Sequence, residues 1–164
     1  MTTIGVLSDT HGLLDERVLE HFAYVDEIWH AGDIGTPEVL QRLREFKPTR
    51  AVYGNCDYGD VRATLTDFYR FRVEDVEVLL THIGGYPGNY NLNARRMIER
   101  KPPKLFVCGH SHILKVQYDP YFRMLCINPG AAGKYGFHTI QTLLRFKIDK
   151  YDIKDMEVIE LARR

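Results

Sequence analysis

The chain has 164 residues and a mass of 19.1 kDa, a length that favours one compact domain spanning residues 1–164. Hydrophobic residues make up 45% and charged residues 27%, which excludes disorder, a coiled coil and a collagen-like repeat. Twenty-two basic and 22 acidic residues give a formal net charge of zero. The bulk charge therefore does not favour binding to long nucleic acid or anionic lipid.

No segment approaches the roughly 18 apolar residues of a membrane span, and we expect no signal peptide, because the sequence enters an apolar strand without a basic segment or a small-residue cleavage site. The three cysteines, Cys56, Cys108 and Cys126, fit neither a disulfide framework nor a structural zinc site. We therefore expect a cytoplasmic protein with reduced thiols. Aromatic residues make up 12% and could supply a dimer patch, so homo-oligomerisation stays open.

Strand and helix patterns alternate over the first fifty residues. Apolar runs at 4–7, 28–30 and 51–53 predict strands, and amphipathic stretches at 13–24 and 37–46 predict helices between them. This order indicates a parallel sheet with right-handed crossovers, and ligands of such sheets bind beyond the carboxyl ends of the strands.

The rest of the chain adds a hairpin, one helix and a largely antiparallel set of strands. The predicted strands are 68–73, 76–81, 105–108, 114–118, 124–127, 140–148 and 153–161, and the helix is 91–100. A parallel half followed by an antiparallel half predicts an α/β fold with two facing mixed β-sheets flanked by helices.

Polar motifs follow five of the predicted strands, at the point where each strand ends. Because such strand ends meet at one edge, we expect the motifs to gather there. They are Asp9-Thr10-His11, Gly32-Asp33, Gly54-Asn55-Cys56-Asp57, Thr81-His82 and Gly109-His110-Ser111-His112. Their carboxylates, imidazoles and amide form a nitrogen and oxygen ligand set that suits divalent transition metals. The glycines let the backbone approach a bound group closely.

The order of these motifs resembles that of the calcineurin-like metallophosphoesterase superfamily, whose pattern reads D-x-H, G-D, G-N-[H or C], H and G-H-x-H. The resemblance covers residues 9 to about 128. In its length, its Cys56 variant and its Asn128-Pro129-Gly130 turn, the chain is similar to the small stand-alone phosphodiesterase branch. This resemblance implies a four-layer α-β-β-α sandwich.

The resemblance also implies two metal sites. It assigns Asp9, His11, Asp33 and His112 to one ion, and Asp33, Asn55, His82 and His110 to the second. Asp33 would bridge the pair, because a carboxylate can hold two cations about 3.5 to 4 Å apart with its two oxygens. Such a pair shares a water, lowers its pKa and holds it as a hydroxide for in-line attack on phosphorus. Manganese is the metal implied, although iron, nickel, cobalt or zinc would accept the same ligands.

The expected function is therefore a dimetal-dependent phosphodiesterase or phosphatase acting on a small phosphoester, with catalytic roles for Asp33, Asn55, His82 and Cys56. Many members of the superfamily carry a histidine at the position of Cys56, where it can protonate the leaving group. A thiol is a poorer acid near neutral pH, so esters with good leaving groups should suffer least. Ile83 is a second departure, because this branch more often has glycine directly after the histidine.

Other readings of these residues stay open. Asp9 and Asp33 could cap helices, Asn55 could only form a turn, and His110 and His112 could be ordinary polar loop residues. We expect structural roles for His21 and His30, whereas His138 could either reach a phosphate or begin a strand. The loop at 84–90 could contact a substrate or be an ordinary surface loop.

The alternative function is a metal-binding scaffold for protein partners, because the resemblance includes a retromer subunit of this fold that works mainly by binding proteins. His11, which completes the first metal site, favours the enzyme. Cys56 keeps the scaffold open, because loss of a proton donor is one route to inactivity.

Overall fold

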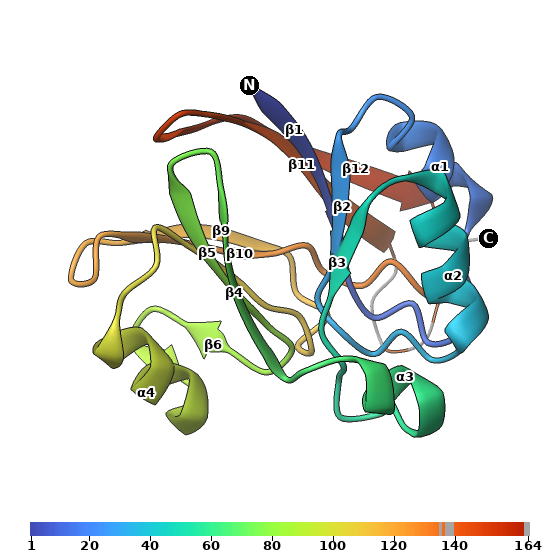
Figure 1. The fold of residues 1–164 in the computed structure, drawn as a ribbon, viewed down its shortest axis with the longest axis horizontal. Coiled ribbons are helices and arrows are strands. Elements are labelled where there is room, and N and C mark those ends of the chain that lie inside the picture. The colour runs from blue at the N-terminus through green and yellow to red at the C-terminus, as the bar shows by residue number, and fades with distance from the viewer. Residues whose placement is uncertain (135, 137–139, 163–164) are drawn as a thin grey trace.

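The computed structural model describes residues 1–134, 136 and 140–162, which form two five-stranded sheets and a small hairpin (Figure 1). The first sheet has the order β12-β11-β1-β2-β3. Its strands are β1 (Thr2–Leu7), β2 (Glu27–His30), β3 (Thr49–Ala51), β11 (Ile140–Asp149) and β12 (Asp152–Ala162). The strands β1, β2 and β3 run parallel, whereas β11 pairs antiparallel with both β1 and β12.

The second sheet has the order β4-β5-β8-β10-β9. Its strands are β4 (Phe68–Val73), β5 (Val76–Thr81), β8 (Leu105–Val107), β9 (Lys115–Asp119) and β10 (Met124–Asn128). Here β5, β8 and β10 are parallel, and the outer strands β4 and β9 are antiparallel to their neighbours. The separate hairpin consists of β6 (Gly85–Tyr86) and β7 (Asn89–Tyr90).

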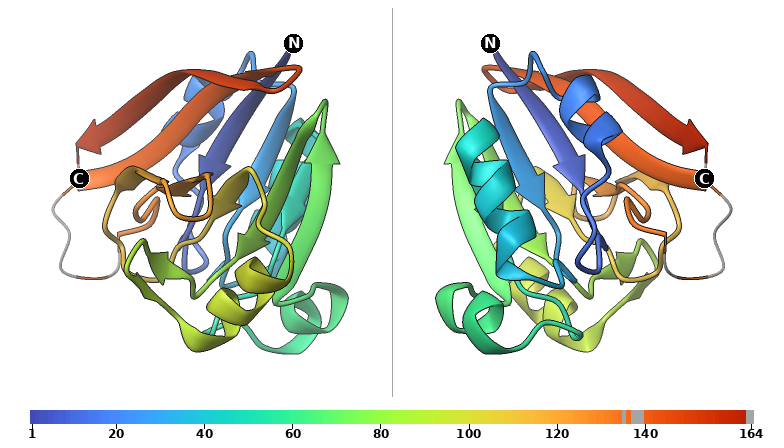
Figure 2. Two further views of the ribbon diagram at one scale, coloured as in Figure 1. Left: turned by 90° about the vertical axis from the view of Figure 1, so that its left-hand side faces the viewer. Right: turned by 90° about the vertical axis from the view of Figure 1, so that its right-hand side faces the viewer.

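Three buried clusters hold the layers together. Trp29, Leu80 and Phe146 belong to the cluster between the two sheets. A second cluster packs the first sheet against α1 (Glu16–His21) and α2 (Pro37–Phe46), and a third packs the second sheet against α4 (Leu92–Arg100). The two further views show the sheets facing each other with helices outside (Figure 2). The predicted fold of two facing mixed sheets flanked by helices is confirmed.

Local chemistry explains where the helices begin. The Asp15 carboxylate accepts a hydrogen bond from the backbone N–H of Arg17 at the start of α1, and Asn91 caps α4 in the same way. Pro37 occupies the first turn of α2, where no N–H partner is needed. The helix α1 is shorter than the predicted 13–24, because Asp15 places its start after the loop that follows β1.

The structure corrects the sequence prediction in four further places. A short helix, α3 (Gly59–Thr64), follows the third strand, and β6 and β7 form a hairpin within the predicted loop at 84–90. The third strand covers 49–51 rather than 51–53. The strands of the C-terminal third also divide between the sheets: β9 and β10 join the second, and β11 and β12 join the first.

No helix within the described residues is long and apolar enough to cross a membrane.

Candidate metal centre

Each of the seven predicted ligands lies in a loop after a strand, and the structure gathers all seven at one edge of the two sheets. Asp9 and His11 follow β1, Asp33 follows β2 and Asn55 follows β3. His82 directly follows β5, and His110 and His112 follow β8. In Figure 2 the arrows of β1 and β2 point to this edge, opposite the end where the N-terminus lies.

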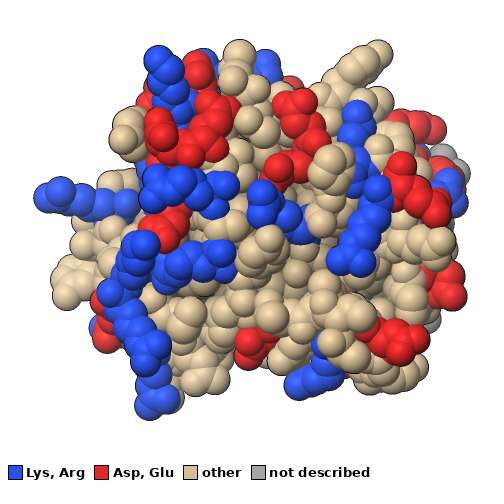
Figure 3. Space-filling model, in the orientation of Figure 1, with Lys and Arg blue, Asp and Glu red and all other residues tan. Residues whose placement is uncertain are grey.

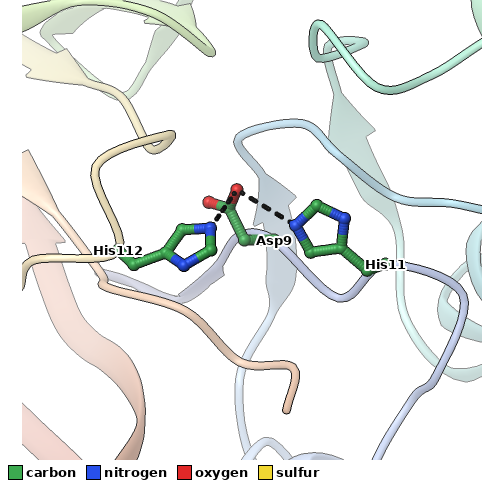
Figure 4. Close-up of side chains that lie close together, drawn as sticks. All are labelled: Asp9, His11 and His112. Carbon is green, nitrogen blue, oxygen red and sulfur yellow. Dashed lines mark ion pairs between the residues drawn. The ribbon is translucent and has the colours of Figure 1, made fainter. Parts of the chain in front are cut away.

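The first ligand cluster consists of Asp9, His11 and His112, whose donor atoms all lie within 4.8 Å of one another (Figure 4). Asp9 Oδ1 is 3.2 Å from His112 Nε2 and 3.7 Å from His11 Nε2. The other oxygen, Oδ2, accepts hydrogen bonds from the Ser8 hydroxyl and the His110 backbone N–H. One oxygen of Asp9 is therefore held by the protein while the other faces the two imidazoles.

The second cluster consists of Asp33, His82 and His110. Asp33 Oδ2 is 3.2 Å from His82 Nε2, and Asp33 Oδ1 accepts a hydrogen bond from the Cys56 N–H. Asn55 Oδ1 lies 3.1 Å from His110 Nδ1, which places the amide beside this cluster.

Asp33 also lies next to the first cluster, with its Oδ2 3.8 Å from His11 Nε2. A further group of His11, Asp33 and Cys56 has donor atoms within 4.8 Å of one another, so a sulfur atom borders the nitrogen and oxygen set. Asp33 is thus the carboxylate that both sides of the site can share.

The backbone at the candidate ligands is strained. Asp9, His11, Asp33, His110 and His112 all have φ between 48° and 69°. Non-glycine residues rarely adopt this left-handed conformation, and where it persists the surrounding structure must enforce it. Each such residue lowers the stability of the fold. Five of them in one site indicate that the surrounding structure holds these side chains pointing into the site at that cost.

Two glycines of the predicted motifs make room for the carboxylates. A Cβ at Gly54 would collide with the backbone N and Oδ1 of Asp33, and one at Gly109 would lie 2.9 Å from Asp9 Oδ2. Any larger residue at either position would push a candidate ligand out of place.

The charges of the site favour a cation. Burial raises the pKa of the Asp9 carboxyl, but the imidazoles of His11, His112 and His82 outweigh burial and hold that pKa well below its usual range. The pKa of Asp33 follows the same pattern: burial raises it, but the neighbouring His82 outweighs burial, so the pKa is lowered. In return, Asp9 raises the pKa of His11, and the carboxylates overcome burial to raise that of His82. A metal ion that displaced these protons would satisfy the same negative charge.

The hydrogen bonding of His82 fits a metal ligand. Its Nδ1 lies 2.7 Å from the carbonyl oxygen of Ala31, to which it must donate, so Nε2 faces Asp9 and Asp33 and offers a lone pair to a metal once its proton is displaced. Within the described residues, Nε2 of His82 and Oδ1 of Asp9 are buried and make no hydrogen bond. They lie 3.9 Å apart, and cations bound at these two atoms would remove the cost of leaving them unsatisfied.

Asp57 connects two of the ligand loops. Its buried carboxylate accepts hydrogen bonds from the backbone N–H groups of Ile34, Gly35 and Gly54, at 3.1, 2.9 and 2.8 Å. The first two belong to the loop that carries Asp33, and the third precedes Asn55. Asp57 therefore fixes the distance between the shared carboxylate and the amide ligand.

His30 and Thr10 connect the first two loops. The Gly32 N–H donates to His30 Nδ1, which leaves Nε2 to donate to the Thr10 hydroxyl at 3.0 Å. The Thr10 hydroxyl in turn donates to the carbonyl oxygen of Ile34. Burial lowers the pKa of His30 to about 4, so this chain of hydrogen bonds contains a neutral imidazole at neutral pH.

Comparison with known families agrees with this geometry. Residues 2–151 match the calcineurin-like phosphoesterase superfamily domain. The chain belongs to this superfamily. Members act on phosphoesters with divalent metal ions, and the two ligand clusters of this metallophosphoesterase suit such ions.

Two curated relatives are archaeal. A probable metallophosphoesterase of Methanothermobacter thermautotrophicus is 32% identical, over 78% of this chain and 76% of that protein. One from Methanocaldococcus jannaschii is 30% identical, over 78% of this chain and 67% of that protein.

Solved structures share the fold at lower identity. An archaeal phosphodiesterase is 24% identical with a TM-score of 0.76, covering 97% of this chain and 99% of the other. Vps29 from Entamoeba histolytica in complex with zinc is 14% identical with a TM-score of 0.74, covering 98% of each chain. These likenesses show the fold alone.

The sequence pattern predicted the ligands but not the residues that hold the ligand loops in place. The motif contains Asp57, but the spacing of residues predicts no role for it, because its three backbone partners lie in two loops. His30 lies outside the metal-binding groups found among the described residues, and its hydrogen bonds are structural. His138, for which the sequence allows two roles, lies outside the described residues.

Replacing Asp57 by Asn should loosen the two loops, because an amide offers one acceptor oxygen and turns an N–H₂ toward backbone N–H donors. We expect manganese affinity to fall about 10- to 100-fold, as for other residues that orient ligands. Titration calorimetry on the folded variant measures the loss. Asp60→Asn, at an exposed position of α3, is the control. Wild-type affinity in Asp57→Asn would contradict the role of Asp57.

His30 should make the metal-free protein less stable in acid. Its pKa is about 4 when folded and 6.5 in the unfolded reference, so the unfolded chain binds the proton first as pH falls. The contribution of neutral His30 to the free energy of unfolding is complete above pH 6.5 and decreases by about 3 kcal/mol toward pH 4. Urea unfolding of wild type and His30→Asn at pH 7 and pH 4 isolates this contribution, because neighbouring groups titrate in both proteins. An equal loss of stability in the two proteins would refute it.

Proposed function

We propose that residues 1–164 form a single metallophosphoesterase domain that hydrolyses phosphodiesters with two divalent metal ions, manganese being the expected metal. The observation that carries the proposal is Asp33. This one carboxylate lies within reach of His11 on one side and of His82 and His110 on the other. A shared carboxylate between two sets of ligands is the arrangement that two-metal hydrolysis requires.

In this proposal Asp9, His11, Asp33 and His112 hold one ion, and Asp33, Asn55, His82 and His110 hold the other. The ions, when bound, supply the Lewis acidity that activates a water and neutralises the phosphate oxygens. The chain supplies position. Ser8 and the His110 N–H orient Asp9, the Cys56 N–H orients Asp33, and the Ala31 carbonyl fixes the tautomer of His82.

Cys56 bears on the leaving group. Partial loss of hydration and the neighbouring Asp33 carboxylate raise the pKa of the exposed Cys56 thiol. The thiol therefore stays protonated at neutral pH and is a weak acid. When water attacks phosphorus and the bond to the leaving oxygen breaks, that oxygen receives little help from Cys56. This chemistry favours esters whose leaving groups depart without protonation.

The charge distribution supports a small substrate rather than long nucleic acid. Lys and Arg gather over α4 at the lower left of Figure 3, and elsewhere on this face both signs are interspersed. Acidic and uncharged side chains separate the basic groups on this face, and the formal net charge is zero, which favours a small substrate over a polynucleotide backbone. The three cysteines are free thiols, which supports action in the reducing cytoplasm.

The proposal predicts manganese-dependent hydrolysis of bis(4-nitrophenyl) phosphate by protein stripped of metal and then reloaded. Asp33→Asn should reduce the rate at least about 100-fold, because losing the shared carboxylate disturbs both ions. The matched control is Asp26→Asn, which should keep the activity. The Asp26 carboxylate is exposed in the loop after α1 and accepts a hydrogen bond from the Thr3 N–H.

Absence of turnover with manganese, nickel and cobalt, despite two ions bound per chain, would overturn the proposed function. The chain would then be better explained as a metal-binding scaffold for protein partners, the reading to which its likeness to the fold of Vps29 leads.

Replacing Cys56 by His should raise the rate on esters with poor leaving groups, because an imidazolium can protonate the departing alkoxide. General acid catalysis contributes about 10²- to 10⁴-fold, and we expect a gain of at least tenfold. Hydrolysis of thymidylyl-thymidine, followed by chromatography, measures the gain against bis(4-nitrophenyl) phosphate as the activated ester. Cys56→Ser controls for loss of the thiol. An unchanged ratio of the two rates would contradict the role assigned to this position.

A further inference from the structure

Two pockets of about 310 Å³ each open beside the candidate metal centre. The first is lined by Asn55 and His82, and the second by His110. Ile83, which directly follows His82, lines both. A phosphodiester whose phosphorus lay at the metal centre could therefore place one substituent in each pocket. The departure from glycine at position 83 gives the two pockets a common wall.

Each pocket has one cation held over a tyrosine ring. In the first pocket the Arg62 guanidinium lies 4.4 Å from the centre of the Tyr53 ring, and in the second the Lys115 ammonium lies 4.2 Å from that of Tyr86. Such contacts orient a cation without neutralising it. Within the described residues, neither Arg62 nor Lys115 forms an ion pair with a carboxylate.

The two pockets differ in their acidic residues. Asp67 lines the first pocket with Arg62, so the charges there balance. The described lining of the second pocket contains no carboxylate. Asp119, on β9, is not part of this lining, and its oxygens accept hydrogen bonds from the Tyr90 hydroxyl and the backbone N–H of Tyr121. Within the described lining of the second pocket, the positive charge of Lys115 therefore has no carboxylate to balance it.

Ser111 adds a hydrogen-bond donor to the second pocket. Its hydroxyl oxygen accepts hydrogen bonds from the Asn128 side chain at 3.1 Å and from the Ile113 N–H at 3.2 Å. With both acceptor positions of the oxygen occupied in this way, the hydroxyl proton is left to donate. A lysine ammonium and a hydroxyl proton in one pocket are a suitable pair for a phosphate oxygen.

We infer that the pocket lined by Lys115 and Ser111 binds a second phosphate group of the substrate. The preferred substrate is then a phosphodiester with a further phosphate on one arm, and the balanced pocket beside Arg62 takes the uncharged arm. This inference rests on the proposed function for the position of the scissile phosphorus, but binding of the second phosphate can be measured without turnover.

The test compares two pairs of compounds that differ by one phosphate. Thymidine 5′-(4-nitrophenyl phosphate), with and without a 3′-phosphate, gives kcat/KM from released 4-nitrophenolate. Thymidine 3′,5′-bisphosphate and thymidine 5′-monophosphate give affinities by calorimetry on the manganese-loaded protein. In wild type we expect the additional phosphate to improve kcat/KM and affinity about tenfold or more, as a hydrogen bond to a charged group does.

In Lys115→Ala the ratio of the values with and without the additional phosphate should fall to near one in both pairs. The loss in kcat/KM should come from a higher KM and not from a lower kcat. Lys115→Arg should restore the preference. Lys104→Ala is the matched control, because Lys104 also lies over a tyrosine ring, that of Tyr151, but lines neither pocket. Arg62→Ala should keep the preference, since it alters the other pocket.

A preference that survives in Lys115→Ala, or that disappears equally in Lys104→Ala or Arg62→Ala, would overturn the inference. If neither nitrophenyl ester nor bis(4-nitrophenyl) phosphate is hydrolysed, the proposed function fails, and the calorimetric preference of wild type over Lys115→Ala still decides whether the pocket binds phosphate.

Discussion

The carboxylate of Asp33 is the group on which the rest of the site depends. It is buried, it accepts a hydrogen bond from the Cys56 N–H, and it lies between the imidazoles of His82 and His11. A buried charge of this kind is costly unless cations or hydrogen bonds surround it. The neighbouring histidines and the backbone N–H reduce that cost, and Gly54 leaves the room that the carboxylate occupies. The strained backbone at five ligand positions is explained by the same need to aim donors at one centre.

The sheets supply the loops, but buried polar residues fix the distances between them. Asp57 ties the loop of Asp33 to that of Asn55, and His30 with Thr10 ties the loop of Asp9 to that of Asp33. Asp57 accepts three backbone hydrogen bonds, and His30 and Thr10 each bond one backbone group, in addition to the backbone hydrogen bonds that already join the loops of Asp9 and Asp33. The site is therefore held in position by hydrogen bonds between loops, and the pockets on either side of Ile83 are built on this frame.

The sequence predicted the mixed sheets and the meeting of the motifs, because both follow from local patterns and from the geometry of parallel strands. It could not predict α3, whose six residues bury only Val61 and leave almost no periodic signal. It also missed how β9–β12 divide between the sheets, since strand pairing depends on long-range packing. The role of Asp57 and the placing of Arg62 and Lys115 over tyrosine rings depend on tertiary contacts, which no spacing along the chain encodes.

The most direct test of the central claim is the anomalous diffraction of a manganese-soaked crystal. We predict two peaks on either side of Asp33, about 3.5 to 4 Å apart, with Asp9, His11 and His112 around one and Asn55, His82 and His110 around the other. A single peak, or two peaks of which one does not contact Asp33, would contradict the claim that this carboxylate joins two metal sites.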